Sequence, residues 1–194
     1  MRGQAYRRKH DTGFFQPVIR RLDDGRLTFN NLIEVHNLRA LRVKHEIRLD
    51  HVRGAIEIAG KAYGISRLLI SKELLFDAGG LFLERYGQLL ELSPSQQIAI
   101  KGVLIDYLSR IDYDSDGLPT GFFPIERTIS NSGKKLILVS PVISFGRPVV
   151  QRVGVSTHII ADRLNAGESE ESVMKDYGID AAELKEAAAY EAAA

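Results

Sequence analysis

The sequence predicts an α+β fold, and three of its patterns lead to that prediction. Apolar residues recur at helical spacing near the front, between residues 32 and 41. Short runs of β-forming residues alternate with Pro and Gly between residues 118 and 150. Three short helical segments near the end each follow a residue that can cap a helix. With 194 residues, 44% of them hydrophobic, the chain can bury a core as one large or two small domains.

The front of the chain predicts a β-hairpin followed by two helices. We expect the hairpin over residues 14–29, because β-forming residues flank the turn at 23–25, where glycine accepts a positive φ. The next segment has helical spacing, and the residues able to cap it are Thr28, Asn30 and Asn31. A second helix is expected to begin near Asp50 and to end at Gly64.

The middle of the chain mixes strand and helix signals. Residues 74–92 predict a hairpin or three short strands around glycine-rich turns. Residues 93–96, Ser-Pro-Ser-Gln, favour a helix start, because Ser caps, Pro is tolerated at the first helical position and Gln can reach back to the cap. We expect that helix to run to about Ile111, with short β pieces following.

The last segment gives the clearest local signals. The residues expected to cap its three helices are Ser156 or Thr157, then Ser169, then Asp180 together with Glu183. Apolar side chains on these helices can share one small core, which we expect to contain Ile159, Ile160, Leu164, Val173, Met174, Tyr177, Ile179 and Leu184. A module of this size should pack against the rest of the chain or against a second copy, so we expect a homodimer.

Composition narrows the class of protein. The chain has no cysteine, which removes disulfides, thiolate metal sites and cysteine nucleophiles. Its apolar runs are far shorter than the roughly 20 residues that a membrane helix needs. The basic N-terminus lacks the apolar stretch of a secretory signal. We therefore expect a cytoplasmic protein without membrane contact.

Charge is unevenly distributed along the chain. Residues 1–54 hold twelve Lys/Arg against six Asp/Glu, whereas residues 155–194 hold three against nine. A basic front favours nucleic acid or an acidic protein as partner, although a solvated surface remains the alternative. The residues predicted to contact DNA are Arg7, Arg8, Lys9, Arg20, Arg21 and Arg26. Such contacts with phosphates carry no sequence information, so we expect DNA binding to be weak and unspecific.

Four stretches near the end of the chain carry a family resemblance. They are Pro141–Val150, Val155–Thr157, Ala166–Ser169 and Asp176–Gly178. Their pattern of a glycine-x-proline strand, a short helix ending in glycine and two further capped helices resembles domain-of-unknown-function family 433. Arg152 stands where that family usually has glycine. The resemblance implies an antitoxin of the VapB type, encoded beside a PIN-domain ribonuclease toxin that it silences.

The front carries a second resemblance. Leu27–Glu34, Leu38–Arg42 and Ile47–Arg53 look like the later helices of a MerR-like winged helix-turn-helix. In longer antitoxins of this kind a helix-turn-helix precedes the segment matching Arg2–Arg8, and we expect its base-reading helices to be absent here.

These resemblances and the local signals together predict three parts. They are a winged-helix remnant over residues 1–66, a β-rich middle with one long helix over 67–140, and a trihelical, helix-turn-helix-like module over 141–194.

The toxin's chemistry suggests which residues contact it. As the resemblance implies, a PIN-domain ribonuclease holds a divalent metal with acidic residues, and arginine binds carboxylates in a fork while keeping its charge. The partner-binding candidates are therefore Arg147, Arg152 and Arg163. The alternative for Arg147 is a hydrogen bond to the local backbone.

No pattern in the sequence favours catalysis. Residues 112–117 match the first half of a calcium loop, but its twelfth position is Phe123 instead of the bidentate glutamate. We therefore expect no enzyme, no metal and no cofactor. Two alternatives stay open. One is a stand-alone MerR-like transcription regulator that senses a ligand in a cavity lined by Phe76, Phe82 and Tyr86; the other is a hydrolase with acidic residues converging in a cleft.

Overall fold

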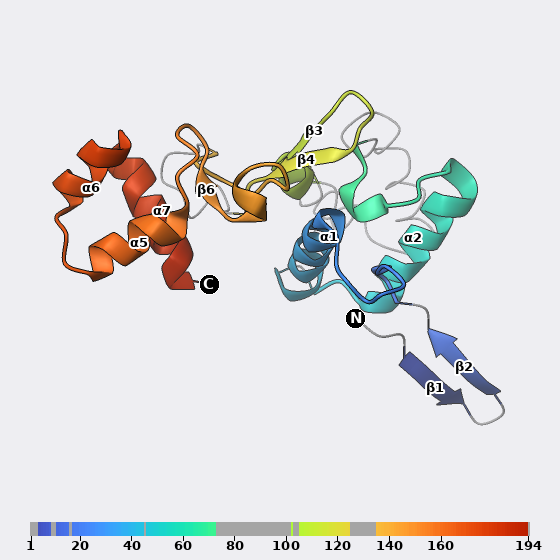
Figure 1. The fold of residues 1–194 in the computed structure, drawn as a ribbon. Helices are drawn as coiled ribbons and strands as arrows, with labels where there is room; N and C mark the ends of the chain where they lie inside the picture. The colour runs from blue at the N-terminus through green and yellow to red at the C-terminus, as the bar shows by residue number, and fades with distance from the viewer. Residues whose placement is uncertain are drawn as a thin grey trace. The chain divides into compact units, whose positions relative to one another are not determined.

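The computed structural model mixes helices with small antiparallel sheets, which confirms the α+β prediction (Figure 1). It describes residues 4–8, 11–15, 17–44, 46–72, 102, 105–124 and 135–193, and for 4–8, 11–15 and 44 it gives the backbone alone. The chain forms two compact units, residues 1–109 and 110–194. The predicted three-part division at residues 66 and 140 stays a prediction.

The first unit opens with a β-hairpin in a different place from the predicted one. Strands β1 (Gln4–Arg8) and β2 (Asp11–Phe15) pair antiparallel. The hairpin expected over residues 14–29 is wrong: the turn forms, with Gly25 at φ 81°, but the described residues 17–28 around it form no strand. The reason is that residues before this turn contact the following helix instead, since Ile19 is buried and the Arg20 carbonyl accepts a hydrogen bond from Asn31.

Two helices follow, as predicted. Helix α1 (Phe29–Arg39) begins at Thr28, whose hydroxyl accepts from the Asn31 backbone N–H while the Asn31 side chain accepts from the Thr28 N–H. It continues into the π-helical turn η1 (Ala40–Lys44). Helix α2 (Leu49–Tyr63) ends at Gly64, which adopts the left-handed conformation at φ 68° that glycine tolerates best.

A buried polar network joins α1 to the short 3₁₀ turn η2 (Leu68–Ile70). Glu34 is only 7% exposed and accepts two hydrogen bonds from the Arg67 guanidinium, at 2.9 and 2.7 Å. The Asn31 amide donates to the same carboxylate and to the Arg20 carbonyl, and the Asn37 amide donates to the Leu69 carbonyl. These bonds compensate the cost of burying a charge and fix the loop that carries Arg20 on α1.

Much of the predicted middle region lies outside the described residues. This applies to the strands expected over 74–92, to the cavity expected at Phe76, Phe82 and Tyr86, and to the helix start at 93–96. Residues 102 and 105–108 of the expected helix are helical, but the chain turns at 109–110. Ile111 therefore belongs to a strand and not to the end of that helix.

The second unit begins with two small antiparallel ladders, in line with the predicted short β pieces. Strand β3 (Ile111–Tyr113) pairs with β4 (Pro119–Phe122), and β5 (Ile137–Leu138) pairs with β6 (Val149–Val150). An isolated bridge between Phe122 and Val139 connects the ladders. The glycine-x-proline segment that the family pattern treats as a strand lies just before β6, and pairing begins only after it, at Val149 and Val150.

Three helices complete the second unit, and their predicted starts are confirmed. They are α5 (Thr157–Asn165), α6 (Glu170–Tyr177) and α7 (Ala181–Ala193). The Ser169 hydroxyl accepts from the Ser172 N–H at the start of α6. At the start of α7 the Asp180 carboxylate accepts from the Glu183 N–H at 2.8 Å, and Glu183 accepts in return from the Asp180 N–H at 2.9 Å.

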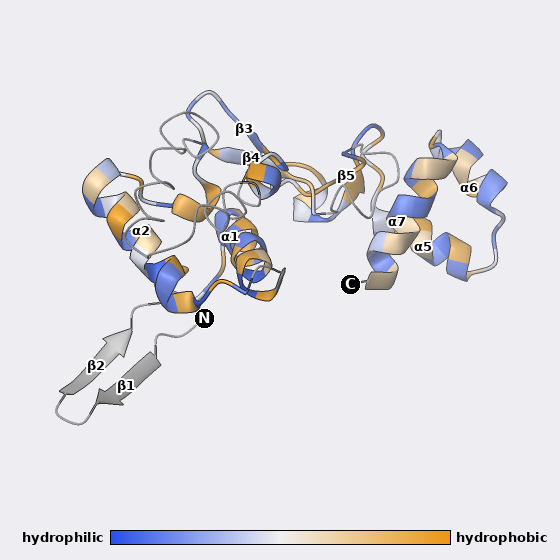
Figure 2. Ribbon diagram, turned by 180° about the vertical axis from the view of Figure 1, so that it is seen from behind, coloured by the Kyte–Doolittle hydropathy of each residue, from blue (hydrophilic) through white to orange (hydrophobic). Residues whose placement is uncertain are grey.

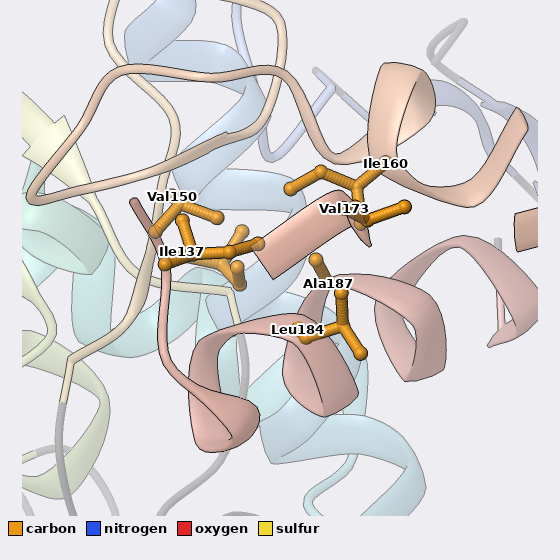
Figure 3. Close-up of a cluster of buried hydrophobic side chains, with 7 residues drawn as sticks. Ile137, Val150, Ile160, Val173, Leu184 and Ala187 are labelled. Carbon is orange, nitrogen blue, oxygen red and sulfur yellow. The ribbon is translucent and has the colours of Figure 1, made fainter. Parts of the chain in front are cut away.

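The core of this helical module includes strand residues as well as helix residues. Figure 3 shows Ile137 and Val150 beside residues of the three helices, and the buried set is Ile137, Val150, Ile160, Val173, Ile179, Leu184 and Ala187. Leu164, Met174 and Tyr177 pack against it as predicted. Ile159 was predicted to be in this core, but it is 46% exposed, because the helical turn that buries Ile160 directs its neighbour outward.

Hydropathy along the ribbon alternates within these helices, with apolar and polar positions both present (Figure 2). Among the described residues, no helix combines the length and the apolar character that crossing a bilayer requires.

Candidate functional site

The candidate site is the loop of residues 141–147 between β5 and β6, which we call the Phe145 loop. Both of its ends are held by hydrogen bonds to neighbouring elements. Before the loop, Ser140 is buried and its hydroxyl donates to the Thr120 carbonyl at 2.7 Å. After the loop, the Pro148 carbonyl accepts from the backbone N–H of Thr157 at 3.1 Å, and the Thr157 hydroxyl donates to the Glu191 carboxylate of α7. The loop is therefore anchored to the β4 strand on one side and to the helical module on the other.

The backbone of the Phe145 loop is strained. Three consecutive residues have positive φ: Ser144 at 47°, Phe145 at 55° and Gly146 at 80°. Glycine adopts this conformation at little cost, but each residue with a side chain costs about 1 kcal/mol or more. Internal hydrogen bonds hold the conformation, from the Gly146 N–H to the Ile143 carbonyl and from the Arg147 N–H to the Ser144 carbonyl. Strain of this kind gathers at functional sites.

The strained turn presents apolar side chains to solvent. Phe145 is completely exposed, at 102% of its reference area, and Val142 is 86% exposed. Val149 and Val150 of β6, a few residues further on, are buried in hydrophobic clusters. Phe145 and Val142 belong to neither cluster. An isolated aromatic side chain with this exposure on an anchored loop is a candidate contact for a partner.

Arg147 lies two residues after Phe145. Of the three predicted partner-binding residues, it is the one whose guanidinium is not paired with a carboxylate among the described residues. Its side chain is exposed. Its backbone N–H closes the loop, whereas its guanidinium remains available for an external carboxylate. Arg147 and Phe145 are two residues apart, so one partner surface can contact both.

Arg152 is used inside the module. Its guanidinium donates twice to the Glu183 carboxylate, at 3.0 and 2.7 Å, and once to the Gly178 carbonyl at 2.6 Å. This pairing holds the pKa of Glu183 below its usual value and raises the pKa of Arg152. The arginine at this position thus ties the turn after β6 to the start of α7. Its predicted contact with a partner stays a prediction.

Arg163 is also paired within the module. It donates to the carboxylates of Glu168 and Asp176, and its guanidinium lies 5.0 Å from the centre of the Tyr177 ring. The pairing lowers the pKa of Glu168 and raises the pKa of Arg163. Arg163 therefore connects α5 with α6, and its role toward a partner likewise stays a prediction.

The predicted DNA-binding residues fall into separate groups. Arg20 and Arg21 are exposed, and within the described residues neither has an acidic partner. Arg26 pairs with Asp24 at 2.7 Å. The backbone places Arg7 and Arg8 in β1, and Lys9 lies outside the described residues.

Two further exposed basic residues were not among the predicted DNA contacts, and the apolar side chains of the Phe145 loop were not among the predicted partner contacts. Arg39 and Arg42 are exposed at the end of α1 and in η1, and the structure shows no acidic partner for either among the described residues. Their helical spacing could have drawn attention to them. For Phe145 the sequence signal is weak, because a phenylalanine between two β pieces is normally assigned to a strand.

The half calcium loop at residues 112–117 is a hairpin turn between β3 and β4. Asp114 accepts hydrogen bonds from the backbone N–H groups of Asp116 and Leu118, and Asp112 pairs with Lys135. The Asp114 carboxylate therefore stabilises the turn, and the Asp112 carboxylate connects β3 with Lys135. Across the described residues, no three His, Asp or Glu side chains lie together as a metal site would require.

Fold and site together define an α+β protein whose C-terminal helical module carries an anchored, exposed loop. Residues 137–190, which contain that loop and the three helices, match the family described as protein of unknown function DUF433. The X-ray crystal structure of Rv2018 from Mycobacterium tuberculosis is similar in fold, with a TM-score of 0.67 and 23% sequence identity over 84% of this chain and 78% of that one. No curated protein matches the sequence.

Proposed function

We propose that this protein is an antitoxin of a type II toxin-antitoxin system that binds and neutralises a PIN-domain ribonuclease of the VapC type. The family match over residues 137–190 supports the proposal, because the resemblance of this segment implies antitoxins of the VapB type. The observation that carries it at the level of residues is Arg147. A permanently charged guanidinium with no acidic partner among the described residues, on an anchored loop of that segment, suits binding to an acidic protein site.

The chemistry of inhibition follows from the toxin's metal site. A ribonuclease that holds a divalent cation with several carboxylates has a strongly negative entrance when the cation is absent. An inserted guanidinium can pair with one carboxylate in a fork and compete with the cation or with substrate. Arg152 and Arg163 already pair with carboxylates of their own module, so in this proposal they stabilise the helical module and Arg147 enters the toxin.

The front unit has a secondary role in this proposal. We propose a winged-helix remnant, in which the hairpin β1–β2 accompanies α1 and α2 and the basic residues contact DNA phosphates. Arg20 and Arg21, exposed beside the start of α1, favour this role. Binding of this kind would support autoregulation only weakly, because phosphate contacts do not read sequence.

The first test is genetic and biochemical. We expect a PIN-domain reading frame beside the gene, growth arrest when that ribonuclease is expressed alone, and recovery with a purifiable complex when the full chain is co-expressed. Arg147→Ala should weaken recovery and complex yield. Lys185→Ala, an exposed cation of α7 with no acidic partner in the described chain, is the matched control. If the wild-type chain gives no recovery, the proposed function is contradicted. If both variants give equal recovery, the role of Arg147 is contradicted.

A further inference from the structure

The Phe145 loop exposes apolar side chains although both of its ends are anchored. Phe145 is fully exposed and Val142 is nearly so, although burying side chains of this kind is one of the main sources of folding free energy. Each end of the loop is nevertheless held, by the bond from the Ser140 hydroxyl to the Thr120 carbonyl and by the bond from the Thr157 N–H to the Pro148 carbonyl. The protein thus holds an apolar side chain in water on an anchored loop, which favours a partner that covers it.

The backbone conformation of the loop also favours a partner that covers Phe145. Phe145 has φ 55° and ψ 35°, in the left-handed region that a phenylalanine rarely adopts. A glycine at this position would relieve the strain and remove the exposed ring together. Stability of the free protein therefore does not explain this phenylalanine, whereas a function that needs its ring does.

The charge of the surroundings identifies the kind of partner. Residues 137–193 contain five Lys/Arg and nine Asp/Glu, and Arg152 and Arg163 are already paired. Nucleic acid and anionic lipid present negative charge over a wide area and would need many free cations, which this module lacks, whereas a single carboxylate needs only one. One free cation next to one exposed aromatic ring suits a protein surface that has an apolar pocket with a carboxylate at its rim.

We propose that Phe145 is the apolar anchor of this protein's complex: its ring fills an apolar pocket of the ribonuclease, and Arg147 pairs with a carboxylate at the edge of that pocket. Val142, three residues before Phe145 and 86% exposed, adds apolar area to the same loop. This inference rests on the proposed function, since it names the ribonuclease as the occupant. Because the loop is held in its strained conformation before binding, little conformational entropy is lost when the complex forms.

The experiment measures affinity and stability in the same set of full-length variants. The probe is the neighbouring PIN-domain ribonuclease, made inactive by replacing one metal-binding carboxylate. We expect Phe145→Gly to weaken binding by at least about 30-fold, as loss of a buried aromatic anchor does, while the thermal midpoint is no lower than that of the wild type. Phe145→Tyr should keep most of the affinity. Leu118→Ala, which removes another exposed apolar side chain of the same unit, should change neither quantity.

The outcomes separate this inference from the proposed function. If the wild type binds and Phe145→Gly binds equally well, the proposed function stands and the role of Phe145 is overturned. Failure of the wild type to bind the ribonuclease overturns both. The other candidate that could cover the ring is a second copy of this chain, which light scattering on the same samples tests. If Phe145→Gly turns a dimer into a monomer without weakening ribonuclease binding, the ring contacts that second copy and the inference is overturned. A Phe145→Gly chain with a clearly lower midpoint would overturn it too, because the ring would then stabilise the fold.

Discussion

Glu183 shows how one side chain can serve two structural purposes. Its carboxylate accepts the backbone N–H of Asp180 and also two hydrogen bonds from Arg152, and the residue is only 3% exposed. The first contact begins helix α7 and the second attaches that helix to the turn after β6. The hydrogen bonds from Arg152 lower the pKa of Glu183 more than burial raises it, so the charged form is favoured in the folded state.

Replacement of Glu183 by Gln should destabilise the protein by about 1–2 kcal/mol at neutral pH, because a neutral amide accepts weaker hydrogen bonds from Arg152. A group with a lowered pKa in the folded state stabilises the fold above its ordinary pKa, and this contribution is lost as the pH falls through the lowered value. The difference between wild type and Glu183→Gln should therefore shrink in acid. Urea denaturation at several pH values measures it, with Glu170→Gln in the first turn of α6 as control. A difference independent of pH would contradict the charged role of Glu183.

At the scale of elements, sequence signals were reliable where they are local. The starts of α1, α6 and α7 were predicted from side chains that bond to backbone groups three residues away, and such bonds depend little on the rest of the fold. The hairpin expected over 14–29 was wrong, because a turn sequence does not decide whether the flanking residues pair with each other or contact a helix.

The conformation of the Phe145 loop could not be predicted from the sequence. Positive φ at Ser144 and Phe145 is disfavoured for both residue types, so no local preference indicates it. It depends on anchors that are distant in sequence, from Ser140 to Thr120 and from Thr157 to Pro148. For the same reason the sequence identified Arg147, Arg152 and Arg163 as candidates but could not show which guanidinium is free.

The reciprocal cap of α7 gives a prediction at this scale. Asp180→Ala removes the acceptor of the Glu183 N–H, so the first turn should loosen and the protein should lose about 1 kcal/mol of stability. Asp180→Asn retains an oxygen that can accept the same bond and should be nearly neutral. Thermal denaturation followed by circular dichroism compares the two variants. Equal loss in both would mean that the charge of Asp180, and not its capping bond, stabilises the helix.

At the scale of the whole molecule, the basic front and the acidic module favour different partners. Residues 1–54 have twice as many basic as acidic residues, whereas residues 155–194 have three times as many acidic as basic residues. We expect DNA binding by the front to be weak, insensitive to sequence and steeply reduced by salt. Replacing Arg7, Arg8 and Lys9 by Ala should lower the slope of log affinity against log salt by up to about 0.9 for each phosphate that is no longer neutralised. Tight binding to one operator, with scrambled DNA ignored, would contradict this expectation.

Assembly is the second prediction at this scale. The module is small, and several alanines of α7 remain exposed beside its buried Ala187, so a second copy could pack closely against this helix. We expect a homodimer by light scattering at micromolar concentration, with α7 protected from protease. A monomer whose residues after 180 are cleaved readily would remove this expectation.

Inhibition of the ribonuclease tests the central claim most directly. The full chain is titrated into the active neighbouring PIN-domain enzyme while cleavage of an RNA substrate is followed. We predict that activity falls in proportion to the added chain and reaches zero near equal amounts, and that Arg147→Glu inhibits far less well because its carboxylate meets the acidic site of the enzyme. Undiminished cleavage in a large molar excess of folded wild-type chain would contradict the account.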